Sequence, residues 1–194
     1  IFGGGMRRGP RRGRNIQMSL DLSLEDAVFG KSIEINLPNT RKKVSVNIPA
    51  GVDTGNKIRL SGEGEPSQYG GDNGDLFIVV NVLGHEFFER EANHLYCEIP
   101  LRIDQAILGD EIEVPTLTKK VLLKIPPETQ TGKVFKLRDL GAGSLHGNSK
   151  GDLFIRVVVE TPSKISGDQK KNISKVFSDL DKNFSESNKF IDKL

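Results

Sequence analysis

The chain has 194 residues, of which 36% are hydrophobic and 28% are charged, with 21 glycines and 9 prolines. This length suffices for one or two hydrophobic cores, and the glycine and proline content predicts many turns. A single cysteine, Cys97, excludes an internal disulfide and a cysteine-cluster zinc site, and we expect it to be a small buried apolar residue. No apolar run approaches the roughly 20 residues that cross a bilayer, so we expect no membrane partner. The lone cysteine indicates a reducing, cytoplasmic compartment.

An arginine-rich arm opens the sequence. Without its five arginines, 23 basic residues face 26 acidic ones, so the rest of the chain carries a net charge of −3. The arm either holds phosphates through counterion release or is a solvated linker. We expect a Gly/Arg-rich linker remnant over residues 1–14, and nucleic-acid binding through the arm is the alternative function. The five residues are Arg7, Arg8, Arg11, Arg12 and Arg14.

From residue 15 onward the sequence alternates apolar and polar residues, which is typical of half-buried strands. Between the first two strands, Ser23 as an N-cap and Gly30 as a stop predict a helix of one or two turns. A polar, glycine-rich loop follows over Ser61–Asn73. The strands predicted in this half are Met18–Leu24, Ile33–Leu37, Val44–Ile48, Lys57–Leu60 and Leu76–Leu83.

The same pattern then occurs a second time. Ile48–Gly55 returns as Ile125–Gly132, and Gly74–Ile78 returns as Gly151–Ile155, each 77 positions later. Earlier in the two copies the offset is 79, so an insertion or deletion of two residues separates the paired segments. Two units of roughly 75–80 residues predict tandem domains. The second copy is expected to hold strands at Leu95–Ile103, Glu111–Val114, Val121–Ile125, Val134–Leu137 and Leu153–Glu160, with a short helix over Asp104–Leu108.

We therefore expect a mainly β fold of two tandem β-sandwich-like domains, each with one short helix, followed by a C-terminal amphipathic helix. After Thr161-Pro162, apolar residues at helical spacing form one stripe, which packs either on its own domain or on a second protomer. The stripe consists of Ile173, Val176, Phe177, Leu180 and Phe184. The expected segments are a linker remnant over 1–14, a first domain over 15–88, a second domain over 89–162 and a helix segment over 163–194.

The sequence gives little support to an enzyme. It has no Gly-x-Ser-x-Gly elbow, no Walker-type loop and no His-Glu-x-x-His helix. His85, His94 and His146 lack metal-ligand spacing, so we expect structural or solvated roles for them, no metal and no cofactor. Asp75 and Asp152 each precede an apolar strand, and we expect them to cap the turn there.

The apolar rows of the first two strands suggest a binding surface. Met18–Leu24 and Ile33–Leu37 each present alternate apolar side chains, and Phe87-Phe88 lies at the end of this unit. If part of these rows stays uncovered, it forms a groove beside a strand edge that suits an extended peptide. Otherwise all of these side chains belong to the core.

Seven motifs keep a distinctive order and spacing along the chain. They are Ile48–Gly55, Ile58–Gly64, Gly74–Leu76, Phe88–Glu91, Asn93–Tyr96, Gly109–Leu117 and Glu128–Gly132. Together they resemble the C-terminal region of DnaJ-type J-domain co-chaperones, from about Asn15 to Leu194. The J-domain with its His-Pro-Asp tripeptide is missing, and so are the four Cys-x-x-Cys pairs of the zinc-binding members. The chain resembles the zinc-free class, or a zinc-free deletion of the other class.

The resemblance implies a non-enzymatic co-chaperone fragment of the stress response that binds apolar segments of unfolded or misfolded polypeptides. In the full-length protein it would deliver them to a DnaK-type 70-kDa heat-shock chaperone. The family's peptide pocket corresponds here to Met18, Leu20, Ile35, Leu37 and Phe88. Cys97, Ile99 and Thr116 stand at corresponding positions of the second half, so we expect that half to be a poorer peptide binder.

The resemblance also implies two partners. An acidic C-terminal tail of the 70-kDa chaperone would bind cations beside the first-domain pocket, unless these cations are merely solvated surface charge. The cations are Lys31, Arg41, Lys42 and Lys43. A second copy of the chain would pair through the C-terminal helix stripe and form a homodimer.

Overall fold

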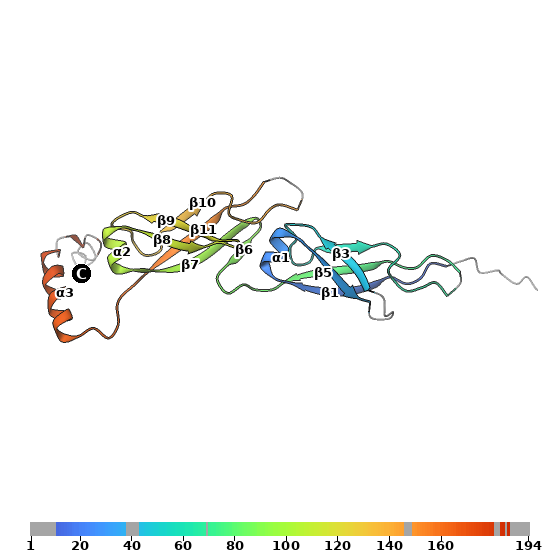
Figure 1. Cartoon of the computed structure of the whole chain (residues 1–194), viewed down its shortest axis with the longest axis horizontal. Helices are drawn as coiled ribbons and strands as arrows, with labels where there is room; N and C mark the ends of the chain where they lie inside the picture. The colour runs from blue at the N-terminus through green and yellow to red at the C-terminus, as the bar shows by residue number, and fades with distance from the viewer. Residues whose placement is uncertain are drawn as a thin grey trace, which may run out of the picture.

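The computed structural model describes residues 11–37, 43–68, 70–145, 149–180, 183, 184 and 186. Arg7, Arg8, Arg41, Lys42 and His146, to which the sequence analysis assigned roles, lie outside the described residues. The described chain is mainly strands with three helices, arranged as two β units followed by a C-terminal helix (Figure 1). This confirms the predicted fold class.

The first half holds two small sheets and one short helix. Its three-stranded sheet has the order β1-β5-β4, in which β1 and β5 run parallel and β4 and β5 antiparallel. The antiparallel pair β2-β3 forms the other sheet. The elements are β1 (Ile16–Leu22), α1 (Leu24–Phe29), β2 (Lys31–Asn36), β3 (Lys43–Ile48), β4 (Lys57–Leu60) and β5 (Leu76–Val82).

The second half repeats this topology and adds one strand. Its larger sheet has the order β10-β11-β7-β6, with β7 and β11 parallel, and β8-β9 forms the antiparallel pair. The added strand β6 is not among the strands that the sequence predicted. The elements are β6 (Glu89–Glu91), β7 (His94–Arg102), α2 (Ile103–Leu108), β8 (Asp110–Pro115), β9 (Lys120–Ile125), β10 (Val134–Leu137) and β11 (Leu153–Glu160), followed by α3 (Gly167–Asp179).

Each half buries the inward rows of its two sheets in a cluster of its own. Alternation along β1 and β5 directs every second side chain inward, as the period-two pattern predicted. The first cluster is centred on Val46, Ile48, Leu76, Ile78 and Val80, and the second on Leu95, Leu101, Leu153, Ile155 and Val157.

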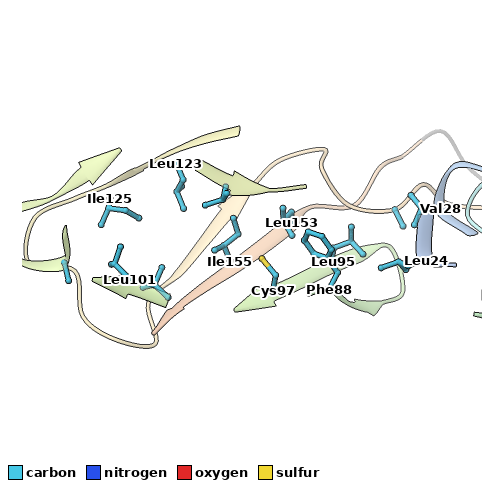
Figure 2. Packing of buried hydrophobic residues seen from close by; sticks show 14 residues of the cluster. Leu24, Val28, Phe88, Leu95, Cys97, Leu101, Leu123, Ile125, Leu153 and Ile155 are labelled. Atoms are coloured by element: carbon cyan, nitrogen blue, oxygen red, sulfur yellow. The ribbon is translucent and has the colours of Figure 1, made fainter. Parts of the chain in front are cut away.

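The two halves also share buried contacts. Leu24 and Val28 of α1 belong to the cluster of the second half, where Figure 2 shows them at its end near Phe88 and Leu95. Arg90 of β6 crosses in the other direction, because its guanidinium donates to the carbonyl oxygens of Val52 at 2.7 Å and of Gly51 at 3.0 Å. The halves therefore pack against each other as well as following one another in sequence.

The repeated Gly-Asp motif closes the same turn in each half. In the first, the Asp75 carboxylate accepts from the Gly62 N–H at 3.0 Å and pairs with Arg59 at 2.6 Å and with Arg12. In the second, Asp152 accepts from the Asp139 N–H at 3.1 Å and pairs with Lys136 at 2.7 Å. The aspartates do cap a turn, but it is the turn after β4 or β10, 13 residues upstream, and not the predicted one directly before β5 or β11. Each carboxylate also forms ion pairs with basic side chains of this chain, which are Arg59 and Arg12 in the first half and Lys136 in the second.

The glycine of that motif is required by a close backbone approach. A Cβ at Gly74 would lie 1.9 Å from the carbonyl oxygen of Arg14, and one at Gly151 would lie 1.7 Å from that of Asn93. The chain entering β1 or β7 therefore passes directly over this position, which only glycine accommodates.

The arginine arm is attached to the first half from Arg11 onward. Besides the Arg12 ion pair, the Arg11 carbonyl oxygen accepts from Ser67 at 2.6 Å, and the Arg14 carbonyl oxygen accepts from the Glu65 N–H at 2.9 Å. The part of the predicted linker that the structure describes thus packs against the loop before β5.

The short helix α1 has the predicted ends. The Ser23 Oγ accepts from the Asp26 N–H at 3.1 Å, and Gly30 ends the helix with φ 76°. The C-terminal helix is shorter than the apolar stripe predicts, since α3 ends at Asp179, Leu180 is its C-cap and Phe184 lies beyond it. Phe184 still contacts Phe177, with ring centroids 6.1 Å apart. Among the described residues, no helix has the length and apolar character needed to cross a membrane.

Candidate functional site

Four strands of the first half, β1, β4, β2 and β3, each have one edge without a strand partner in the described part of the chain, and β1 and β2 carry the predicted pocket residues. Strand β1 pairs only with β5, and β2 pairs only with β3. Each strand therefore has one edge whose N–H and C=O groups are available to a further strand. This arrangement suits the addition of an extended peptide.

Four of the five predicted pocket residues lie together in the first cluster. Ile35 and Leu37 are buried, whereas Met18 and Leu20 are half-buried and pack against the cluster from β1. The two β1 side chains are partly exposed because no described strand pairs with β1 on the side away from β5. Apolar surface at an open strand edge is the combination that the sequence analysis proposed.

The fifth predicted residue, Phe88, lies elsewhere. It is buried in the second cluster beside Leu24 and Val28, and its backbone N–H donates to the Nδ1 of His85 at 3.2 Å. The structure therefore places Phe88 at the junction between the halves, and its contact with a peptide stays a prediction.

The predicted cations do not form a single group. Lys31 pairs in register with Ile48, at the end of the β2-β3 hairpin opposite Lys43, which pairs with Asn36. Lys31 lies 2.7 Å from the Asp26 carboxylate, and Lys43 lies 3.9 Å from Glu34. Of the predicted tail-binding cations, only Lys43 is therefore near the hairpin turn within the described structure.

The second half lacks the same apolar set. Cys97 replaces Met18 and is buried, and burial raises the pKa of its thiol to about 11. The position of Leu37 is taken by Thr116, whose hydroxyl donates to the Lys119 carbonyl oxygen at 2.6 Å and so closes the β8-β9 turn. Ile99 and Val114 keep the apolar character of their counterparts Leu20 and Ile35.

The histidines of the described chain have structural roles. His94 Nδ1 accepts from the Asp152 N–H at 3.0 Å, which holds the start of β7 against the turn before β11. His85 Nδ1 accepts from the Phe87 N–H at 3.0 Å, and its Nε2 lies 3.3 Å from Glu25 of α1. Within the described ranges, histidine, cysteine and acidic residues form no group of three suited to a metal ion.

The apolar stripe near the C-terminus is largely uncovered. Helix α3 has no buried residue, and Ile173, Val176 and Phe184 are exposed, while Phe177 and Leu180 are half-buried. The hydroxyl of Ser166 caps the helix by accepting from the Gln169 N–H at 3.3 Å. The helix is thus formed and capped with its apolar side unoccupied.

A comparison with protein families decides what this duplicated β fold is. The family model of the DnaJ C terminal domain matches residues 16–162, which span both β units from β1 to just past β11. The chain belongs to the DnaJ C-terminal domain family. The resemblance seen in the sequence motifs is thereby confirmed.

Membership in the DnaJ C-terminal domain family supports a chaperone-type role in binding substrate polypeptides, together with a general partnership with 70-kDa heat-shock chaperones. The domain is a chaperone domain and not an enzyme family. In this member, the segment between β2 and β3 has six residues and no cysteine. The two-residue difference between the halves falls in this turn, because the offset is 79 up to β2 and 77 from β3 onward.

Proposed function

We propose that the first half binds apolar segments of unfolded or misfolded polypeptides between the open edges of β1 and β2. The observation that carries the proposal is the half-exposed pair Met18 and Leu20 at an unpaired strand edge, next to buried Ile35 and Leu37. In the full-length protein the bound segment passes to a DnaK-type 70-kDa heat-shock chaperone. We place this co-chaperone activity in the cytoplasm and in the stress response.

Binding combines two contributions. The backbone of the client pairs with a strand edge, which accepts any sequence, while its apolar side chains bury against the β1 row. Burying one Leu or Phe side chain contributes about 1.5–3 kcal/mol. Much of this gain is offset by the ordering of a flexible peptide. The site therefore holds clients weakly and reversibly, which suits a protein that hands them on.

The test is a titration of a labelled, uncharged apolar peptide, followed by fluorescence anisotropy. Leu20→Ser removes an anchor at the proposed site, and Ile99→Ser removes its half-buried counterpart in the second half. We expect Leu20→Ser to weaken binding roughly tenfold, which corresponds to about 1.4 kcal/mol. Ile99→Ser should leave binding unchanged. Equal losses in the two variants, or none in Leu20→Ser, would contradict the proposal.

Nucleic-acid binding through the arginine arm is the alternative. One observation disfavours it, namely that the Arg12 guanidinium is already engaged in an ion pair with the buried Asp75 carboxylate. Phosphate binding weakens steeply with salt, whereas apolar peptide capture changes little. The affinity for the client peptide is therefore measured between roughly 50 and 300 mM salt. An affinity that does not change over this range supports apolar peptide capture, and a steep decrease supports binding through the arginine arm.

We further propose that an acidic tail of the 70-kDa partner binds beside the β2-β3 turn. The support is Lys43 at that turn, next in sequence to Arg41 and Lys42. Lys43→Glu should weaken binding of an acidic tail peptide. Lys31→Glu, at the far end of the hairpin, is the matched control. Equal affinities of wild type and Lys43→Glu would remove this proposal.

We also propose that two copies pair through α3. The support is the uncovered apolar stripe on a helix that is otherwise polar. A two-fold pairing buries the same surface of both copies. A client that engages both copies at once then gains avidity without any new kind of contact.

A further inference from the structure

The outer face of the second half carries a groove that the proposed function does not use. Its volume is about 520 Å³, and it lies between the β7-β11 face and the segment that precedes β6. Two cross-strand rows of side chains contribute to its lining. One contains Phe154, Tyr96 and Glu89, and the other contains Val134, Arg156 and Glu98, as the strand registers show.

The floor of the groove is aromatic. Tyr96 and Phe154 stack with ring centroids 5.1 Å apart and an interplanar angle of 15°. Phe87, in the segment before β6, also lines the groove with 57% of its surface exposed, and Val134 of β10 is exposed as well. Large apolar side chains around a hollow of this size are a surface that a partner can bury.

The rim of the groove is acidic. Four exposed glutamates line it, against a single arginine, Arg156. None of the four forms an ion pair with another described residue. The neighbouring cations bind other groups: Lys136 pairs with Asp152 and lies 5.7 Å from the centroid of the Phe154 ring, and the Arg90 guanidinium binds backbone carbonyls of the first half. The four glutamates are Glu86, Glu89, Glu91 and Glu98.

We infer that this groove binds a segment of unfolded polypeptide in which a lysine or arginine adjoins an apolar side chain. The inference rests on the proposed function for the kind of partner, but it concerns a second site of different chemistry. The glutamates attract the cation, and an exposed ring such as Phe87 offers its face to a guanidinium or ammonium group. The aliphatic stem of the same side chain covers Val134, while the adjoining apolar residue packs on the aromatic floor.

This second site gives the two halves complementary preferences. The first half selects apolar segments without regard to charge, and the groove selects positively charged ones and rejects acidic ones. A client with both kinds of segment binds both halves of one chain. The second half then selects clients by their charge, in addition to acting as a spacer.

The test uses two labelled peptides of equal length with the same apolar residues, one carrying arginines and the other glutamates at the same positions. Anisotropy titrations compare the whole chain with Glu86→Gln/Glu98→Gln and with Phe87→Ser. Glu111→Gln, an exposed glutamate on the opposite sheet, is the control. We expect the arginine peptide to bind at least 3-fold more weakly to each groove variant, an effect that added salt diminishes in the glutamine variant. The control should match wild type.

Three outcomes would overturn the inference. The glutamate peptide binds as tightly as the arginine peptide, or the groove variants bind the arginine peptide like wild type. Alternatively, the groove variants lower the molecular mass seen by light scattering, which would assign the groove to a second copy of the chain. The uncharged apolar peptide separates this inference from the proposed function, since its binding depends on Leu20 and not on the groove glutamates.

Discussion

The two halves of the chain share one backbone plan but differ in what covers equivalent surfaces. The Val28 side chain on α1 is only 4% exposed, because the second half packs over it, whereas its counterpart Ile107 on α2 is 42% exposed. The same helix is therefore an internal contact in one half and a free surface in the other. Position along the chain, rather than the repeat itself, decides which surfaces are buried.

The shared and the divergent positions also differ in kind. The Gly-Asp turn recurs in both halves, each time with a backbone N–H donor and a basic partner for the aspartate. The glycine is needed because the backbone passes too close for a Cβ, and the aspartate is needed because its carboxylate caps the turn. The side chains at the strand edges diverge, as in Met18 against Cys97 and Leu37 against Thr116. The backbone plan tolerates this change, and the two halves acquire different binding surfaces.

The largest expected effect tests the contact between the halves. Leu24→Ala leaves a cavity among buried side chains and should lower the free energy of unfolding by about 2–5 kcal/mol. Ile107→Ala on the equivalent helix should lower it by only about 1 kcal/mol, because that residue is already 42% exposed. Urea denaturation followed by circular dichroism measures both values. Comparable losses would mean that α1 and α2 are equally buried in solution.

A smaller difference should separate the two Gly-Asp turns. The Gly62 N–H, with Arg59 and Arg12, lowers the pKa of Asp75, and Lys136 with the Asp139 N–H lowers the pKa of Asp152. Asp75 is the more deeply buried, at 2% exposure against 16%, and has two cationic partners instead of one. Asp75→Asn should therefore lower the thermal midpoint at pH 7 by roughly 5 °C or more. Asp152→Asn should lower it by a smaller amount.

The pH dependence of these variants follows from the same contacts. A carboxyl whose pKa is lowered by folding stabilises the protein fully above its unfolded pKa of about 3.9, and the stabilisation disappears as the pH falls through the folded pKa. The midpoints of wild type and Asp75→Asn should thus converge below about pH 4. A difference that stays constant from neutral to acidic pH would show that packing, and not the charge of Asp75, causes the loss.

Local patterns in the sequence predicted most elements, and they failed where distant segments meet. The Ser23 cap, the Gly30 stop and the alternating strands are local, and all appear as expected. The strand β6 was missed because Glu89–Glu91 carries no apolar alternation and is held by pairing with β7. The parallel pairing of β1 with β5 was not predicted either, because it joins residues about 60 positions apart and leaves no local signature.

The candidate site was predictable to a similar degree. Four of the proposed pocket residues follow from the apolar rows of β1 and β2 and from the family motifs. Phe88 could not be placed by such reasoning, because its surroundings depend on how α1 packs against the second half. The acidic groove could not be predicted from the sequence, since its lining combines the segment before β6 with residues of β6, β7, β10 and β11 that meet through the strand registers.

The C-terminal stripe extends the comparison to the end of the chain. Helix α1 is covered by the second β unit, whereas no further β unit follows the second one among the described residues. The apolar residues of α3 are therefore largely exposed. If two copies pair, Phe177→Asp with Leu180→Asp places charges where the apolar stripes meet, and the mass from light scattering should halve. Lys175→Asp on the polar side of the same helix is the control and should keep the wild-type mass. A wild-type chain that is already monomeric at micromolar concentration, or a double variant that keeps the wild-type mass, would show that α3 packs on its own chain. A client could then gain avidity only by binding both halves of a single chain.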